Sequence, residues 1–430
     1  MSTPLYDRSR LWYPLDNAAR IYPAIFSSRS TTVYRVSVTL AHAVNSDFLN
    51  TGITEALKRY PYFNLELRTG FFWHYLQICR KSHRARPETN WPCTEISRFA
   101  DSGLFRLLYF NNRISLECSH LLTDGAGAMR FLRLIVHRYL HAAGLAPDRL
   151  DTVPHPDDEV PAAEWEDVYG TVYTGGLPEP EKLESAYRIP GPLFPRGQFS
   201  ITTGLVSTAD LLARAKSYNA SLTEYLGALY LMAFSRHAQS LTAHKRKKLL
   251  RPVRVMIPVN LRTLFGIDTM RNFFLSVTPG IDLRLGTYSL AEIIATVKLK
   301  LADGVDLKQI GRAISRNVGG EKNIIARNAP LFMKLPVERY WYWNSGNVIH
   351  SGILSNLGRA EFPEALSPHI KRVEFITSPG HVARLCVGII SHAGTTAITF
   401  GNITTHTHIP CEFFRALRED GIAITIETNG

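Results

Sequence analysis

The segment Ile114–Gly127 (ISLECSHLLTDGAG) constrains the possible folds most, because it combines a strand, a tight loop and the start of a helix. Its first five residues alternate between apolar and polar side chains, which predicts a strand with one apolar face. The Asn-Asn pair at 111–112 predicts a hairpin turn between this strand and one over 103–110. From about 126 to 141, apolar residues recur at helical spacing. His120 therefore lies where a strand passes into a loop, a position from which side chains commonly reach a cleft.

The length and composition of the chain indicate a globular protein with more than one lobe. Its 430 residues are too many for one ordinary core, which favours two domains or lobes. Hydrophobic residues make up 45% and charged residues 20%, and no apolar run is long enough to cross a bilayer. The first eight residues lack the apolar core of a signal peptide, and the five scattered cysteines form no CxxC pair or disulfide pattern. We therefore expect a cytoplasmic protein with no metal site and no transmembrane segment.

The chain carries a large net positive charge that is unevenly distributed along the sequence. A formal net charge of +12 could attract nucleic acid, an anionic membrane, a phosphorylated cofactor or an acidic protein. A soluble enzyme that is basic without a special partner is an equally good interpretation. Residues 145–198 are the exception, with eleven Asp and Glu against four Lys and Arg, and nine of the 24 prolines. Such a stretch is typical of a long exposed connection, and we interpret it as the crossover between two lobes.

Predicted strands and helices alternate along the chain, which favours an α/β or α+β fold. In the first half we expect strands at 32–40, 64–67, 71–78 and 103–110, a helix at 46–60, and a short helix at 15–20 capped by Asp16 or Asn17. In the second half we expect strands at 198–206, 254–258, 276–283 and 352–358 and helices at 208–218, 221–237, 290–301 and 411–418. Strands at 372–377, 383–390 and 396–401 are expected to form a closing antiparallel sheet. The predicted lobes are 1–185 and 186–430.

Three short blocks follow one another along the chain. They are SHLLTDG at 119–125, IPVNLR at 257–262 with RNFF at 271–274, and SNLG at 355–358. Together they resemble the chloramphenicol-acetyltransferase-like acyltransferases, which include peptide-synthetase condensation domains, plant acyl-CoA-dependent acyltransferases and alcohol acetyltransferases. The bacterial alcohol-acetyltransferase branch is the most similar. An HxxxDG motif alone is a weak signal, but its place between a hairpin strand and a helix, with the other blocks in order, makes the resemblance specific.

The resemblance implies an α/β (α+β) fold of two chloramphenicol-acetyltransferase-like lobes, arranged as a V with a tunnel between them. The catalytic histidine of the family matches His120, which would lie in mid-tunnel, with the thioester donor entering from one mouth and the acceptor from the other. Two features depart from the family pattern. Ser119 replaces the first histidine of the HHxxxDG form, which argues against a standard condensation domain. The DFGWG motif of the plant branch is absent, and residues 355–358 occupy the corresponding region.

We predict that His120 is a general base. A neutral imidazole can take the proton from an acceptor hydroxyl or amine as that atom attacks a thioester carbonyl, and no acyl-enzyme is needed. The alternative is a structural histidine that is hydrogen-bonded in the core. The context of the three blocks favours catalysis.

The resemblance gives Asp124 a structural role, in which its carboxylate faces away from the substrate and pairs with an arginine. Arg262 is the predicted partner and Arg254 the second choice. A Ser-His-Asp relay is the alternative, but the spacing of Asp124 within the same loop suits loop closure better. Backbone amides at Gly125 and Gly127, where a helix begins, are candidates for holding an oxyanion. Simple turn geometry explains these glycines equally well.

Several polar residues are candidates for lining the channel, although capping of strand ends explains each of them equally well. They are Ser119, Asn260, Asn272, Ser355 and Asn356. A basic loop is a weaker candidate for binding cofactor phosphates, because most basic runs are only solvated. Its residues are Lys245, Lys247 and Lys248, with Arg251 nearby.

The leading predicted function is an acyl-CoA-dependent O- or N-acyltransferase of the alcohol O-acetyltransferase type, acting on a small alcohol or amine. Acyl-CoA is then a co-substrate, and no cofactor is bound permanently. One rival takes its acyl group from the phosphopantetheine arm of an acyl carrier protein, and another is a non-catalytic scaffold with the same fold. The basic surface fits either donor because both carry phosphate. No carrier segment is recognisable in the chain, which favours free CoA, and no nucleic-acid partner is expected.

Overall fold

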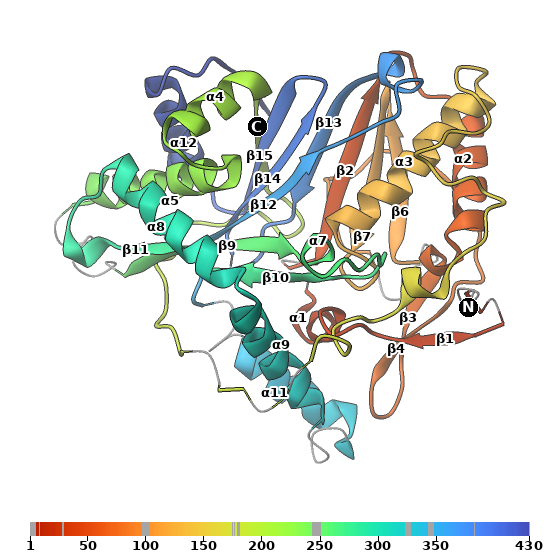
Figure 1. Ribbon diagram of the computed structural model, residues 1–430, viewed down its shortest axis with the longest axis horizontal. Helices are drawn as coiled ribbons and strands as arrows, with labels where there is room; N and C mark the ends of the chain where they lie inside the picture. The colour runs from red at the N-terminus through yellow and green to blue at the C-terminus, as the bar shows by residue number, and fades with distance from the viewer. Residues whose placement is uncertain are drawn as a thin grey trace.

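The computed structural model describes residues 6–429 except for 8, 28–29, 97–102, 174, 176, 179–180, 243–250, 323–327, 343–347 and 382. Within these residues the strands form three sheets, two large and one small (Figure 1). Helices lie against both large sheets, which confirms the predicted α/β (α+β) class.

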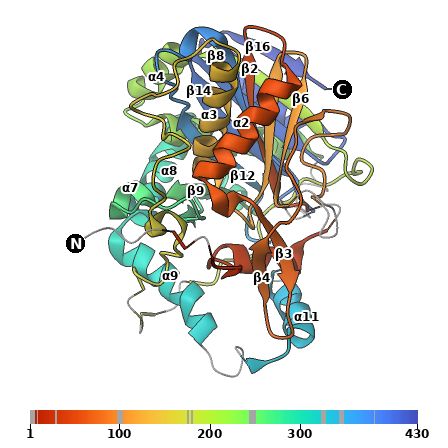
Figure 2. The same cartoon turned by 90° about the vertical axis from the view of Figure 1, so that its right-hand side faces the viewer.

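The first large sheet has the strand order β13-β2-β7-β6-β5 and contains the hairpin that leads to His120. Its strands are β2 (Val33–Leu40), β5 (Arg86–Pro87), β6 (Phe105–Phe110), β7 (Arg113–Ser119) and β13 (Ile370–Thr377). The predicted turn joins β6 to β7, and Asn111 in it has the positive φ of 50° that two-residue hairpin turns favour. Helices α2 (Ser46–Arg59) and α3 (Gly125–Ala142) pack together over one face of this sheet (Figures 1 and 2).

The polar face of β7 is buried rather than solvated. The Glu117 carboxylate accepts hydrogen bonds from Arg35 Nε at 2.8 Å and from the Cys93 amide at 2.6 Å. Arg106 also pairs with Glu117, and Arg35 pairs with Glu88 at 2.6 Å. The alternation in the sequence therefore predicts the two faces of the strand correctly, but the loop around Cys93 and paired arginines cover the polar one.

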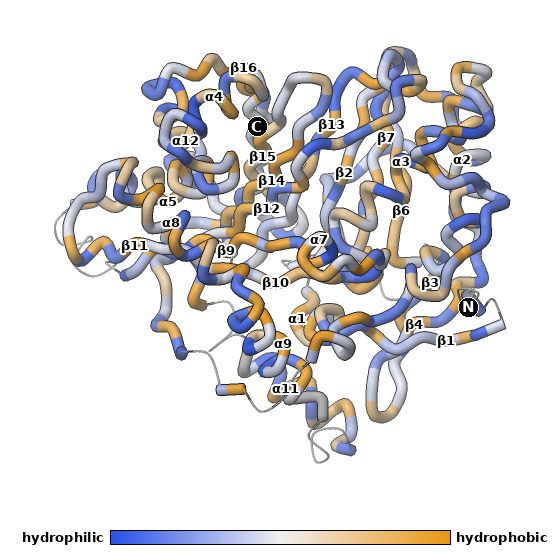
Figure 3. The backbone as a smooth tube through the Cα atoms, in the orientation of Figure 1, coloured by the Kyte–Doolittle hydropathy of each residue, from blue (hydrophilic) through white to orange (hydrophobic). Residues whose placement is uncertain are grey.

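The second large sheet has the order β10-β9-β12-β14-β15-β8-β16, with β11 paired to β9. Its strands are β8 (Ser200–Ser207), β9 (Pro252–Asn260), β10 (Phe274–Val277), β11 (Gly280–Asp282), β12 (Gly352–Arg359), β14 (Leu385–His392), β15 (Thr395–Asn402) and β16 (Ile424–Thr428). Helices α4 (Thr208–Ser217), α5 (Leu222–Ser240), α8 (Leu290–Gly304) and α12 (His408–Glu419) pack around it. Figure 3 shows hydrophobic stretches along β9, β12 and β14, which build the second core. The expected strand at 276–283 is divided between β10 and β11.

One strand of the second half belongs to the first sheet. The sequence predicted that 372–377 would pair with the strands that follow it, but β13 pairs with β2, from Ile370 opposite Leu40 to Thr377 opposite Tyr34. Strands β14 and β15 pair with each other as expected. The two large sheets meet where β13 contacts β14, at a glycine, Gly388, whose missing side chain leaves room for the β13 backbone. The lobe boundary at residue 185 remains a prediction. Strand β13 follows this boundary in the sequence but belongs to the first large sheet.

A small sheet and several helices lie below the two large sheets in the view of Figure 1. The sheet has the order β1-β4-β3, with β1 (Trp12–Pro14), β3 (Leu65–Thr69) and β4 (His74–Ile78). The helical elements in this region are η1 (Ala19–Ile21), α1 (Tyr22–Ile25), α9 (Leu307–Lys322) and α11 (Leu331–Trp341). The short helix expected at 15–20 therefore begins later, although the Asp16 Oδ1 does accept a hydrogen bond from the Ala19 amide at 2.8 Å.

The crossover at 145–198 is mostly irregular where it is described, with one 3-10 turn, η3 (Ala162–Trp165). It is not exposed along its whole length, because Trp165, Tyr169 and Tyr187 are buried. At least one acidic side chain of the stretch is also buried in the protein. Glu164 is buried and pairs with Arg59 at 2.7 Å. The prediction of a long connection is right, but parts of it pack into the cores.

Candidate active site

A cavity of about 2470 Å³ is lined by residues from both large sheets. The first half of the chain contributes His120, Asp124 and Gly125, around the start of α3. The second half contributes Asn260 from the end of β9 and Ser355 from β12. The cavity therefore exists only when the two halves are packed together.

The backbone of His120 is held from two directions. Its amide donates to the Thr32 carbonyl at 3.0 Å, and its own carbonyl accepts from Asn272 Nδ2 at 2.9 Å. Thr32 directly precedes the neighbouring strand β2, whereas Asn272 belongs to the RNFF block of the second half. The position of the histidine is thus fixed by both halves of the chain.

The imidazole ring of His120 packs among three aromatic rings. The distances between ring centroids are 4.5 Å to Tyr34, 5.4 Å to Tyr22 and 6.2 Å to Phe274. Burial lowers the pKa of His120 below its ordinary value of 6.5, while the nearby Asp124 carboxylate acts in the opposite direction. The ring is therefore neutral at pH 7 and able to accept a proton.

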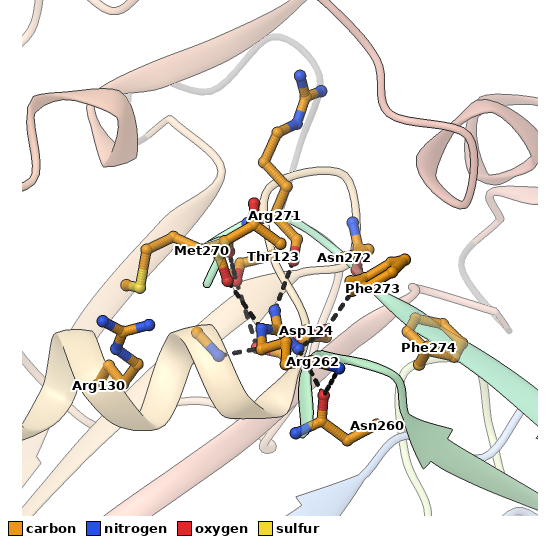
Figure 4. A network of polar contacts seen from close by, with 12 residues as sticks. Thr123, Asp124, Arg130, Asn260, Arg262, Met270, Arg271, Asn272, Phe273 and Phe274 are labelled. Carbon is orange, nitrogen blue, oxygen red and sulfur yellow. Dashed lines mark hydrogen bonds and ion pairs between the residues drawn. The ribbon is translucent and has the colours of Figure 1, made fainter. Parts of the chain in front are cut away.

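Asp124 forms a bidentate ion pair with Arg262 (Figure 4). Arg262 Nη1 donates to Asp124 Oδ2 at 2.8 Å, and Nη2 donates to Oδ1 at 3.0 Å. The side chains are only 7% and 11% exposed. The same carboxylate accepts from the Gly127 amide at 3.1 Å and from the Phe273 amide at 3.0 Å. Arg262 is therefore the partner, as predicted, and the pair is of the strong, charge-assisted kind.

Arg262 also holds the backbone of its own loop. Its Nε donates to the Thr269 carbonyl at 2.7 Å and its Nη2 to the Arg271 carbonyl at 2.6 Å. Each oxygen of the Asp124 carboxylate already accepts two hydrogen bonds, from donors other than His120. This geometry favours loop closure over a Ser-His-Asp relay as the role of Asp124.

At two glycines at the start of α3, the neighbouring residues leave no room for a side chain. A Cβ on Gly125 would lie 2.5 Å from a methyl group of Leu357. A Cβ on Gly127 would lie 2.6 Å from the Met270 carbonyl oxygen and would overlap the Thr123 hydroxyl. That hydroxyl donates to the same Met270 carbonyl at 2.5 Å. The glycines therefore allow residues of the second half to approach the helix start closely.

A buried polar cluster behind His120 was not predicted from the sequence. Asn272 Nδ2 donates to Asp16 Oδ2 at 3.0 Å as well as to the His120 carbonyl. Arg271 Nε lies 3.4 Å from the same Asp16 oxygen, and its Nη2 donates to the Pro14 carbonyl at 2.6 Å. Burial raises the pKa of Asp16 to about 6, against the opposing effect of Arg271. The cluster ties the N-terminal segment to the catalytic loop and to the second half.

Three of the five predicted channel residues line the cavity. They are Asn260, Ser355 and Asn356. The Asn356 side chain already has protein partners, because its Nδ2 donates to Thr223 Oγ1 at 3.0 Å and its Oδ1 accepts from the Gly358 amide at 2.8 Å. Asn260 Oδ1 accepts from Arg262 Nη1 at 3.2 Å. For Asn260 and Asn356 the structural role is therefore present, and a role in binding substrate remains a prediction.

The other two predicted channel residues, Ser119 and Asn272, are buried beside the cavity rather than on its wall. Ser119 Oγ accepts from the Leu121 amide at 3.3 Å, so it belongs to the turn after β7. Arg254, the second choice of partner for Asp124, instead donates to the Glu184 carbonyl at 2.8 Å.

Lys245, Lys247 and Lys248, the weak candidates for a phosphate clamp, lie outside the described residues, and Arg251 beside them is exposed. Within the described ranges, no three His, Cys, Asp or Glu side chains are grouped as a metal ion would require. In the same part of the chain, none of the helices has the length and hydropathy needed to span a membrane.

Comparison with known proteins identifies the fold. No family model and no curated protein matches the sequence. Among solved structures, TRI3 trichothecene 15-O-acetyltransferase from Fusarium sporotrichioides aligns over 97% of this chain and 98% of its own, with a TM-score of 0.60 and 9% identity. F. graminearum TRI101, complexed with coenzyme A and deoxynivalenol, aligns over 96% and 100%, with a TM-score of 0.60 and 10% identity. The first condensation domain of the calcium-dependent antibiotic synthetase aligns over 97% and 100%, with a TM-score of 0.59 and 13% identity.

Identities this low establish the fold alone. The chain has the chloramphenicol-acetyltransferase-like fold that acetyltransferases and condensation domains share. The resemblance predicted from the three sequence blocks is thus confirmed at the level of the fold, which is an acyltransferase-type fold.

Proposed function

We propose that the protein is a thioester-dependent acyltransferase that moves an acyl group from acyl-CoA to an alcohol or amine, with His120 as the general base. The observation that carries the proposal is the neutral His120 ring at a large cavity lined by both halves of the chain. A neutral imidazole in such a cavity can accept a proton while donor and acceptor are bound together. The acetyltransferases of the same fold support this reaction class.

In the proposed reaction, the His120 imidazole takes the proton from the acceptor O–H or N–H as that atom bonds to the thioester carbonyl carbon. The carbonyl π electrons move to oxygen and give a tetrahedral oxyanion. When the C–S bond breaks, sulfur leaves with the electron pair and receives the proton from the imidazolium. An oxyanion lone pair re-forms the C=O bond, and the histidine returns to its neutral state. Because the acceptor attacks the thioester directly, no acyl-enzyme is formed.

The start of α3 supports a further role in the proposed mechanism. Gly125 and Ala126 line the cavity, and the first amides of a helix have no acceptor within the helix. These donors lie at the positive end of the helix dipole and are suited to stabilising the oxyanion. The Gly127 amide is already used, because it donates to Asp124. In this proposal Asp124 and Arg262 act indirectly, by holding the helix start in place.

Free acyl-CoA is the proposed donor and a small alcohol or amine the proposed acceptor. TRI101 binds coenzyme A and a trichothecene in its solved complex, which supports both assignments. The net charge of +12 favours a phosphorylated donor. The similarity to condensation domains keeps a carrier-protein thioester as the second candidate. Four buried cysteines and the exposed Cys411 are all free thiols, which favours a cytoplasmic setting.

A donor screen that measures release of free thiol tests the proposal. We expect thiol release from an acyl-CoA in the presence of alcohols or amines, and much less from the same acyl group on a carrier protein. Faster release from the carrier-bound thioester would instead support the carrier-dependent reaction. No release from any donor, with a broad set of acceptors, would leave the scaffold alternative as the better description.

The pH dependence of kcat/KM tests the state of His120. Since burial holds the pKa of this imidazole below 6.5, protonation should inactivate the enzyme only at acidic pH. We expect kcat/KM to rise with pH through a midpoint below 6.5 and to be level near pH 7. A midpoint clearly above 6.5 would contradict a desolvated, neutral base.

A further inference from the structure

Part of the cavity lining consists of large apolar side chains that are also exposed to solvent. We call this group the apolar rim, and it consists of Trp12, Phe72, Trp73, Met333 and Val337. These side chains all line the cavity, yet each remains between 38% and 57% exposed. Large apolar groups gathered on the surface around a cavity generally mark a site for an apolar ligand or partner.

Helix α11, which carries part of the rim, makes several polar contacts with backbone atoms of other elements. The Leu331 amide donates to the Phe71 carbonyl at 2.9 Å, and Lys334 Nζ donates to the Phe72 carbonyl at 3.0 Å. Arg339 Nε donates to the Ala24 carbonyl in α1 at 2.7 Å. A surface helix normally turns its apolar side chains inward. On α11 the charged side chains hold the helix, and several apolar ones are left uncovered.

Apolar residues of α1 and its neighbours link the rim to His120, and the charged side chains of Lys334 and Glu338 also line the cavity. Tyr22 stacks on the His120 ring with 5.4 Å between centroids, and it is the first residue of α1. Ile21 and Ile25, on either side of it in the sequence, also line the cavity. Helix α1 contacts α11, where Val337 continues the lining to the surface.

We infer that this limb of the cavity binds a long aliphatic chain carried by one of the two substrates, so that the substrate class is lipid-like. The inference rests on the proposed acyl transfer at His120, where the carbonyl or hydroxyl end of that substrate would react. In this inference the aliphatic chain of the substrate lies along Tyr22 and Ile25 and reaches the apolar rim, all of which line the cavity. Each methylene that it buries strengthens binding by about fourfold, because apolar surface is removed from water. A short acyl group or alcohol reaches only the inner part of the limb.

Binding of a fluorescent fatty acid, dansylaminoundecanoic acid, tests the site without requiring turnover. We expect saturable binding to the full chain and equal binding to His120→Ala. The double variant Met333→Asp/Val337→Asp should bind at least tenfold more weakly. The matched control is Leu299→Asp on helix α8, since Leu299 is 69% exposed and does not line the cavity. This control should bind the probe like the unmodified protein. No saturable binding, or equal binding by all four proteins, overturns the inference.

Chain-length selectivity tests the same site during the reaction and shows which substrate carries the chain. One series pairs acetyl- to dodecanoyl-CoA with a short alcohol, and the other pairs acetyl-CoA with ethanol to dodecanol. We expect kcat/KM to rise with chain length in one series. The ratio for twelve carbons over two should fall at least tenfold in Met333→Asp/Val337→Asp and should be unchanged in Leu299→Asp.

The two experiments separate the inference from the proposed function. Probe binding that depends on the apolar rim, with no thiol release from any donor, would refute acyl transfer and support the chain-binding site. Thiol release without probe binding and without chain-length selectivity would refute the chain-binding site and leave acyl transfer supported.

Discussion

Replacing His120 by alanine is expected to lower kcat for acyl transfer by about 10²–10⁴-fold, the usual contribution of a positioned general base. The reason is that the partly buried ring is neutral at pH 7 and lines the cavity where the acceptor would be deprotonated. The substitution removes the base but leaves the loop held, because the amide and carbonyl of residue 120 make the backbone contacts to Thr32 and Asn272. Thiol release from acyl-CoA, per mole of folded protein, measures the effect.

A buried histidine away from the cavity supplies the control for this experiment. His392 is buried on β14, its Nδ1 lies 3.1 Å from the Ala360 carbonyl oxygen, and it does not line the cavity. His392→Ala should lower the thermal unfolding temperature without changing the rate of the folded enzyme. If folded His120→Ala retains near-full activity, the assignment of the general base is wrong.

Local patterns in the sequence predicted most elements, because capping, turns and periodicity act over short distances. Ser221 caps α5 at the position where the predicted helix at 221–237 begins, and the Asn-Asn turn joins β6 to β7. The pairing of β13 was predicted wrongly because it depends on a contact between residues that are distant in the sequence. Its partner, β2, lies more than 300 residues earlier in the chain, and nothing in an alternating strand pattern specifies which other strand it pairs with.

The residues of the candidate site also fall into two groups, those that the sequence could identify and those that it could not. The Asp124–Arg262 pair could be proposed because each residue lies in a recognisable sequence block. The cluster of Asp16 with Arg271 and Asn272 could not be proposed from the sequence. Asp16 lies outside the blocks, and the residues around it indicate only a helix cap. A possible signal is the polar pair Arg271-Asn272 directly before two phenylalanines, which suggests buried polar groups in need of a partner.

Replacing Asp124 by asparagine is expected to lower the free energy of unfolding by about 3 kcal/mol, because it leaves the largely buried Arg262 guanidinium without a counter-charge. The amide also replaces one acceptor oxygen with an N–H donor. That donor would face either the Arg262 and Gly127 donors or the Arg262 and Phe273 donors. A lower midpoint of urea unfolding would measure this loss. Activity should fall too, since the start of α3 and the His120 loop would no longer be fixed.

The same substitution at an exposed ion pair provides the matched control. Asp268 pairs with Arg130 across the two halves and lies in the loop that Arg262 holds, but it is 68% exposed. Because solvent screens such a pair, Asp268→Asn should cost at most about 1 kcal/mol. Asp124→Asn should therefore lower both stability and rate, and Asp268→Asn should leave both nearly unchanged. A large loss of rate in Asp124→Asn at unchanged stability would instead show that this carboxylate takes part directly in proton transfer, as the relay alternative requires.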